Sequence, residues 1–125
     1  MNAEKAEQLK DAHCTIAYAH VIPTIRDIAR RYGYAATIHG SMQRDLDILL
    51  CPWTRKAQDP HKLVAAIVRK LKLYKSKVKP NPEQKPHGRI AWSFYFDRLS
   101  AMRRVGPYLD ISVMPLKPID LADNK

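Results

Sequence analysis

The chain has 125 residues and a mass of 14.4 kDa, enough for one domain with a single hydrophobic core and too few for two ordinary domains. Its mean hydropathy is -0.41 and no apolar run approaches the roughly 18 residues of a spanning helix, so we expect no membrane partner. With 22 Lys and Arg against 12 Asp and Glu the net charge is +10, which suits anionic partners.

The N-terminal part of the chain has the pattern of an amphipathic helix. Apolar residues recur every three or four positions from Ala3 to Tyr32. Pro23 is expected to kink or divide this pattern, because proline lacks the N–H that an interior helical residue donates. Residues 1–23 are therefore predicted to form an N-terminal helix before a second one. Gly33 is well suited to end that second helix.

A hairpin and a further helix are predicted next. The β-prone residues 34–39 and 45–51 flank a turn of five residues, a spacing that indicates two antiparallel strands. Asp59 followed by Pro60 is typical of a helix N-terminus, and the apolar spacing continues to about Lys72.

The second half of the chain contains two further strands. Residues 77–88 hold three prolines and a glycine and are predicted to be a loop, and residues 99–107 a basic connection. Residues 89–97 and 108–114 alternate between apolar and other side chains, as half-buried strands do. The apolar set of the first of these strands, which we expect in the core, is Ile90, Trp92, Phe94 and Phe96.

These elements predict one α/β (α+β) domain over residues 1–125, with a small mixed β-sheet, helices packed mainly on one face, and a C-terminal tail over residues 115–125. Residues 1–13 lack the apolar core of a secretory signal and contain acidic residues, so we expect a cytoplasmic protein. Cys14 and Cys51 are expected to be reduced core residues, and the scattered histidines do not indicate a zinc site.

The sharpest motif surrounds two closely spaced acids. On a strand, side chains two positions apart share a face, so Asp45 and Asp47 are predicted to stand side by side. Asp110 is a third acid on the polar side of the last strand. Mg²⁺ binds through one or two carboxylates together with substrate phosphates, so the three acids are candidate metal ligands. The plainer interpretation is that Asp45 is a turn residue and that Asp47 is solvated or pairs with Arg44.

Three segments resemble the signature of the nucleotidyltransferases of the DNA polymerase beta superfamily. They are Gly40-Ser41, Asp45-Leu46-Asp47 and Leu109-Asp110-Ile111, and they occur in that family's order. The expected order of helices and strands fits the same nucleotidyltransferase-like fold from about residue 24 to residue 114. The stretches HGSMQRDLDILLCPW and YLDISVMP also look like small proteins of phages and bacteria.

The resemblance implies a catalytic role for several residues. Asp45, Asp47 and Asp110 would be the catalytic carboxylates and would bind two Mg²⁺ or Mn²⁺ ions, and Asp110 would belong to the metal on the nucleophile side. Gly40 and Ser41 would hold the β- and γ-phosphates of a nucleoside triphosphate.

Two basic residues are candidates that the family motif does not require. Arg44 lies in the turn beside the acids and is a candidate phosphate contact. Arg89 closes the segment Lys85-Pro86-His87-Gly88-Arg89, which is either a phosphate-binding loop or a turn that leads into a strand.

The positive charge is concentrated in residues 55–89, which hold 11 basic and 2 acidic residues. Such a block favours nucleic acid or nucleotide phosphates as partners, although a solvated lysine-rich helix and loop has the same composition. If the block faces the acids, it would form a basic wall beside a metal-bound polyphosphate.

Two functions remain open from the sequence. The first is a metal-dependent nucleotidyltransferase-like enzyme that transfers a nucleotidyl group from a nucleoside triphosphate to an unknown acceptor. The chain departs from the family pattern because only three residues separate Ser41 from Asp45, too few for the helical segment usual there. The alternative is therefore a catalytically inactive protein of the same fold that binds nucleic acid through residues 55–89, or a protein partner, as a phage modulator or antitoxin-like protein would.

Overall fold

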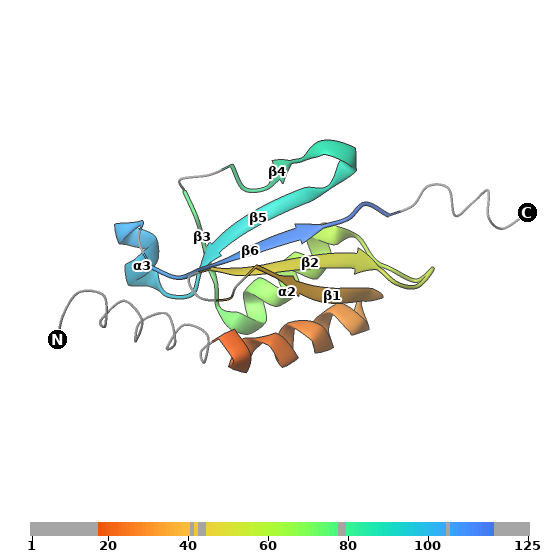
Figure 1. The fold of residues 1–125 in the computed structure, drawn as a ribbon, viewed down its shortest axis with the longest axis horizontal. Helices are drawn as coiled ribbons and strands as arrows, with labels where there is room; N and C mark the ends of the chain where they lie inside the picture. The colour runs from red at the N-terminus through yellow and green to blue at the C-terminus, as the bar shows by residue number, and fades with distance from the viewer. Residues whose placement is uncertain (1–17, 41, 43–44, 78–79, 105, 117–125) are drawn as a thin grey trace, which may run out of the picture.

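The computed structural model describes residues 18–40, 42, 45–77, 80–104 and 106–116. The fold is α+β, with a mixed sheet and its longer helices packed on one face, which confirms the predicted fold class (Figure 1). The strands are β1 (Tyr34–His39), β2 (Leu46–Pro52), β3 (Tyr74–Lys75), β4 (Glu83–Gln84), β5 (Ile90–Tyr95) and β6 (Tyr108–Val113). The helical segments are residues 18–31, α2 (Pro60–Leu71), the 3-10 turn η1 (Pro86–Gly88) and α3 (Arg98–Arg103).

The order of the strands in the sheet is β1-β2-β6-β5-β3, and β4 also pairs with β5. β1 and β2 form the predicted antiparallel hairpin, whereas β2 and β6 run parallel. A parallel pair needs a long crossover, and α2, β3, β4, β5 and α3 all lie in the chain between these two strands. Within the described residues, no helix combines the length and apolar character needed to span a membrane.

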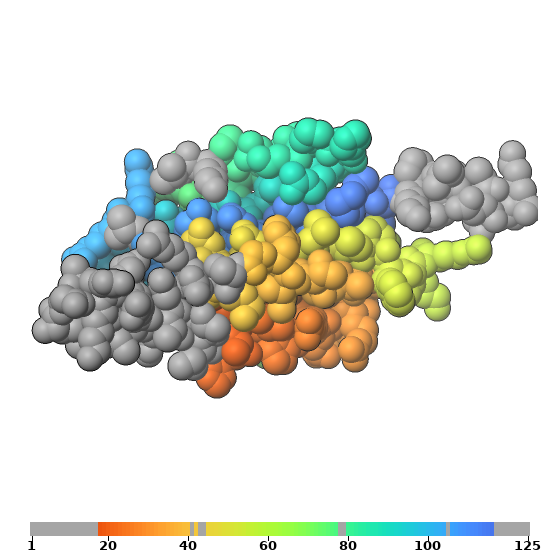
Figure 2. Space-filling model, in the orientation of Figure 1, coloured from red at the N-terminus to blue at the C-terminus, as the bar shows by residue number. Residues whose placement is uncertain are grey.

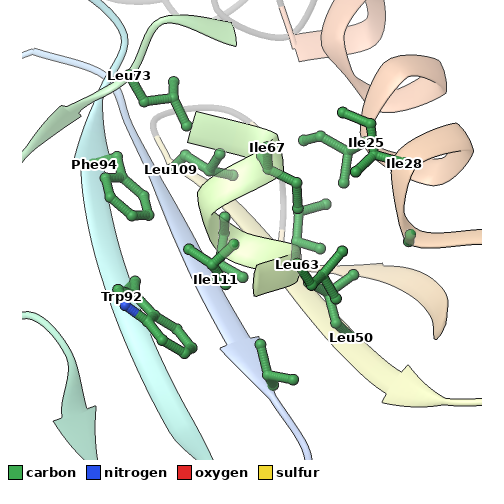
Figure 3. Packing of buried hydrophobic residues seen from close by; sticks show 14 of the residues in the cluster. Ile25, Ile28, Leu50, Leu63, Ile67, Leu73, Trp92, Phe94, Leu109 and Ile111 are labelled. Atoms are coloured by element: carbon green, nitrogen blue, oxygen red, sulfur yellow. The ribbon is translucent and has the colours of Figure 1, made fainter. Parts of the chain in front are cut away.

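The hydrophobic core lies between the sheet and the two longer helices. Alternate residues of β2 and β6 are fully buried on this face, and Figure 3 shows Leu63 and Ile67 of α2 between the strands and the helix of residues 18–31. Trp92 and Phe94 lie in the same cluster, which confirms their predicted place in the core. The buried residues of β2 and β6 are Leu46, Ile48, Leu50, Leu109, Ile111 and Val113.

Pro23 does not divide the N-terminal helix, because residues 18–31 form one unbroken helix. The proline removes an interior hydrogen bond, at about 3 kcal/mol. Ile22, Ile25 and Ile28 are buried on the same helix, and each buried side chain of this size contributes about 1.5–3 kcal/mol. The packing therefore outweighs the break that local propensity predicts. The start of the predicted helix lies outside the described residues.

Short elements occur within or next to the predicted loops. α3 begins at Arg98, directly before the predicted basic connection, and extends into it; its N-cap is Asp97, whose Oδ1 accepts a hydrogen bond of 2.8 Å from the Ser100 N–H. β3 precedes the predicted proline-rich loop and β4 interrupts it, and each strand is only two residues long. Cys51 is a half-buried free thiol on β2, whereas Cys14 lies outside the described residues.

Between the positions where β3 and β4 pair with β5, the backbone of β5 is hydrogen-bonded to the side chain of Asn81. The Asn81 Oδ1 accepts from the Ser93 N–H at 2.8 Å, and its Nδ2 donates to the carbonyls of Ser93 (2.8 Å) and Ser76 (2.9 Å). The Ser76 N–H also donates to the Ser93 carbonyl at 3.0 Å, so the distinct contribution of the Asn81 amide is to supply the acceptor for the Ser93 N–H.

The junction between the first helix and β1 is closely packed. Gly33 has φ +87°, and a Cβ there would lie 2.6 Å from the Ala57 Cα, so only glycine fits. The Gly33 carbonyl accepts from the Trp53 N–H at 2.8 Å, and the Tyr34 hydroxyl donates to the Gln58 carbonyl at 2.7 Å. These bonds attach the chain that follows β2 to the start of β1.

We expect Asn81→Ala to lower the free energy of unfolding by about 1–3 kcal/mol, because the buried Ser93 N–H loses its acceptor. Urea denaturation of the variant and of Gln84→Ala, an exposed residue of β4, measures the difference. Equal loss in both variants would contradict the role of the amide.

Burial, followed by the nearby Asp59 charge, raises the pKa of Tyr34 to about 12. The unfolded chain ionises this phenol near its usual pKa of about 10, so the unfolded state binds fewer protons between pH 10 and 12 and stability falls there as the pH rises. We expect this group to remove about 2 kcal/mol over that interval. Denaturation of wild type and Tyr34→Phe across the interval isolates the loss. Tyr74→Phe, at a 41% exposed tyrosine, should keep the wild-type slope.

Candidate carboxylate site on the open sheet face

Within the described residues, the two longer helices cover one face of the sheet, and the opposite face, which we call the open face, carries polar side chains. Four residues form a row across it, since His39 pairs with Asp47, Asp47 with Asp110, and Asp110 with Ser93. Side chains at paired positions of adjacent strands point to the same face. We refer to these four residues as the polar row. Figure 2 shows atoms of β1 and β2 at the surface across the middle of the molecule.

The centre of the polar row is a pair of carboxyl groups. Desolvation raises the pKa of Asp47, the Asp110 charge raises it further, and the His39 side chain opposes both effects. Asp45 raises the same pKa through its charge, and a hydrogen bond between the carboxyl groups of Asp47 and Asp110 adds to the rise. The two predicted site acids Asp47 and Asp110 are thus side by side, and the charge of Asp45, which directly precedes β2, acts on Asp47.

Asp110 is also held from its other side. The Ser93 hydroxyl donates to the Asp110 Oδ1 at 2.6 Å, and the Ser93 backbone is in turn paired with the Asn81 amide. This short hydrogen bond fixes the orientation of the Asp110 carboxyl group next to Asp47.

Gly40 lies against the same acids. Its φ is +80°, and a Cβ built on it would be 2.9 Å from the Asp47 Oδ2. The backbone of Gly40 therefore approaches the carboxylate as closely as only glycine allows. Of the other predicted phosphate contacts, Ser41 and Arg44 lie outside the described residues.

Arg89 is held on the open face. Its Nη1 donates to the Ser112 Oγ at 3.0 Å, and Ser112 lies two positions after Asp110 on β6. Ser112 and Asp110 are one strand repeat apart, roughly 6–7 Å along β6, so Arg89 is bonded to the position next to Asp110 on this face. The loop that precedes it includes η1, in which His87 and Gly88 both have positive φ.

The basic block does not form a single wall beside the acids. Lys62, Arg69 and Lys70 are exposed on α2, which covers the opposite face of the sheet. A groove of about 770 Å³ between α2 and the helix of residues 18–31 is lined by Arg69 and Lys70 of this set. Only Arg89 of the block has a described hydrogen bond to the open face. The α2 part of the block therefore does not join the expected wall, because a helix that covers one face turns its polar side away from the sheet.

The donor chemistry of the acid pair suits a hard divalent cation. Two neighbouring carboxylates repel each other, and a cation between them relieves the repulsion that raises the Asp47 pKa. In the part of the chain that the structure describes, no group of three or more His, Cys, Asp and Glu side chains is arranged to hold a metal ion. A cation at this site would therefore depend on the Asp47 and Asp110 pair and on oxygen atoms from a bound phosphate.

Sequence reasoning missed two members of the polar row, His39 and Ser93. Both occupy polar positions of predicted strands, so their face could be read from the alternation. Their position beside the acids depends on strand register, which the sequence does not display.

No protein-family model matches the chain, and neither does any curated protein sequence.

We expect Asp47→Asn to stabilise the protein without metal, by on the order of 1 kcal/mol or a few degrees in Tm. The folded-state pKa of Asp47 is above its unfolded value, so the folded state binds more protons than the unfolded state at pH values between these two pKa values. The free energy of unfolding therefore falls as the pH rises from the unfolded-state pKa to the folded-state pKa. The variant should lose that decrease.

Thermal unfolding in EDTA at several pH values tests this expectation. Glu83→Gln is the matched control, because Glu83 pairs with Lys85 at 3.2 Å outside the polar row. A Tm of Asp47→Asn below that of wild type would contradict the repulsion inferred at the acid pair.

Proposed function

We propose that the protein is a metal-dependent nucleotidyltransferase of the cytoplasm that transfers a nucleotidyl group from a nucleoside triphosphate to an acceptor hydroxyl. The observation that carries the proposal is the register of β2 and β6, which pairs Asp47 with Asp110 on one open face. The sequence resemblance supports the same activity, since these acids occupy its second and third acidic positions.

Mg²⁺ or Mn²⁺ would be held by Asp47 and Asp110, with Asp45 as a further carboxylate beside them. When bound, the cation would neutralise the phosphate oxygens and the departing pyrophosphate. Gly40 presents backbone without a side chain next to Asp47, which leaves room for a phosphate. Arg89 adds a positive charge on the same face.

The transfer needs one proton acceptor. The acceptor hydroxyl oxygen forms a bond to the α-phosphorus while the bond from that phosphorus to the bridging oxygen breaks, and pyrophosphate leaves with the electron pair. The hydroxyl proton passes to the Asp110 carboxylate. The hydrogen bond from Ser93 to the Asp110 Oδ1 keeps this group oriented for the transfer.

A catalytically inactive protein of this type that binds nucleic acid or a protein partner is the second candidate. One observation favours it: only three residues separate Ser41 from Asp45, too few for the helical segment usual in the family that the sequence resembles. A phage-encoded modulator or antitoxin-like protein would need the shape of this fold and its basic regions without turnover.

Incubation with each α-labelled nucleoside triphosphate, Mg²⁺ or Mn²⁺, and RNA, DNA or protein acceptors tests the enzyme. We expect labelled acceptor and released pyrophosphate, with Asp47→Asn and Asp110→Asn each lowering the rate at least about 100-fold. Glu83→Gln should retain the wild-type rate.

Metal binding is measured separately by the rise in Tm on adding Mn²⁺, which wild type and Glu83→Gln should show and Asp47→Asn should not. If wild type gives neither transfer nor pyrophosphate and its Tm responds to Mn²⁺ no more than that of Asp47→Asn, the enzyme proposal fails. The inactive binding protein then remains.

A further inference from the structure

Trp53 is unusually exposed for a tryptophan. It directly follows β2, and 77% of its surface is accessible, whereas Trp92 is buried with 5% accessible. Tryptophan side chains are highly buried on average in folded proteins. Its backbone N–H is bonded to the Gly33 carbonyl, so the position of this exposed indole is set by the junction at the start of β1.

The indole borders a groove that we call the Trp53 groove, with a volume of about 520 Å³. That volume is within the range of about 300–1,000 Å³ typical of ligand sites. The small side chains of Ala35 and Ala36 on the edge strand β1 leave the groove open. Its full lining is Arg26, Arg30, Tyr34, Ala35, Ala36 and Trp53.

The charge of the Trp53 groove is of one sign. Arg26 and Arg30 are one helical turn apart and both are exposed. Among the described residues, neither arginine has a carboxylate partner, and the nearby Asp27 pairs instead with Arg31. Their positive charges are therefore available to an anion.

More cations follow the indole in the chain. Arg55 and Lys56 are exposed in the loop between β2 and α2, which projects beyond the sheet (Figures 1 and 2). The exposed indole thus borders two arginines in the groove and is followed in the chain by two further exposed cations. Stacking surfaces interleaved with positive charges are typical of sites for single-stranded nucleic acid.

We propose that the Trp53 groove binds single-stranded nucleic acid, with a base stacked on Trp53 and the adjacent phosphates at Arg26 and Arg30. A single strand is favoured over a duplex because only an unpaired, unstacked base offers its π-face to an indole. This binding is independent of the carboxylate site and needs no metal.

The larger groove beside α2 is a weaker candidate for the same ligand. Arg31, Arg69, Lys70 and Lys72 lie near the C-terminal ends of two helices, where the helix dipole already stabilises positive charges. Asp27 lines that groove as well, and no tryptophan does. It therefore serves as the control surface.

In the test, the protein is titrated into a fluorescein-labelled oligothymidylate of 12 nucleotides in EDTA at low salt, and the fluorescence anisotropy of the label reports binding. We expect Trp53→Ala to weaken binding about 10-fold or more and Trp53→Phe to retain most of the affinity, because phenylalanine keeps an aromatic face. The double change Arg26→Gln with Arg30→Gln should reduce the slope of log affinity against log salt by about 1.4, from about 0.7 for each lost phosphate contact.

Tryptophan emission locates the bound base. The oligonucleotide should quench wild-type emission, and it should leave the emission of Trp53→Phe unchanged, because the remaining Trp92 is buried in the core. The matched control, Arg69→Gln with Lys70→Gln, removes the same charge from α2 and should keep the full quenching. Asp47→Asn should bind like wild type, which separates this proposal from the enzymatic one.

Several outcomes would overturn the proposal. One is the absence of oligonucleotide binding at low salt, and another is equal oligonucleotide affinity of Trp53→Ala and wild type. A third is wild-type tryptophan emission that stays unquenched when the protein is saturated with oligonucleotide. A fourth is polyglutamate that quenches this emission and competes for the groove as well as the oligonucleotide does. The last result would assign the groove to an acidic peptide. A duplex that binds more tightly than the single strand would also contradict stacking on Trp53. Circular dichroism of each variant verifies that the fold is retained.

Discussion

The parallel pairing of β2 with β6 is the constraint on which the rest of the structure depends. It buries Leu46 and Ile48 beside Leu109 and Ile111 on the helix-covered face. Because side chains alternate, the same register places Asp47 next to Asp110 on the open face. A shift of one residue would expose the core residues and bury the acids, so the stability of the core and the geometry of the acid pair are set by one interaction.

That geometry is maintained by a chain of hydrogen bonds that reaches the far edge of the sheet. Asn81 pairs with the Ser93 backbone, and the Ser93 hydroxyl holds Asp110. The edge of β5 is thereby linked to the centre of the candidate site. The repulsion between Asp110 and Asp47 is tolerated because the surrounding strands are closely paired, a situation common at functional sites.

The positive charge of the chain is divided between the two sides of the sheet. The cations of α2 surround the groove on the helix side, Arg89 lies with the acids, and Arg26 and Arg30 border the Trp53 groove at the edge strand. A net charge of +10 thus describes several local fields rather than one basic surface. The acid pair lies on β2 and β6, whereas the exposed indole follows the end of β2, so the proposed metal site and the proposed nucleic-acid site use separate residues.

The sequence by itself determined the local elements: the alternation that defines β2, β5 and β6, the Asp59 and Pro60 start of α2, and the positions of the three acids. These follow from patterns within a few residues of one another. Tertiary structure decided what depends on distant partners: the unbroken helix at Pro23, the Asn81 bridge, the separation of the cations from the acids, and the exposure of Trp53. The pairing of Asp47 with Asp110 belongs to both, because the alternation set the face of each acid and only strand register made them neighbours.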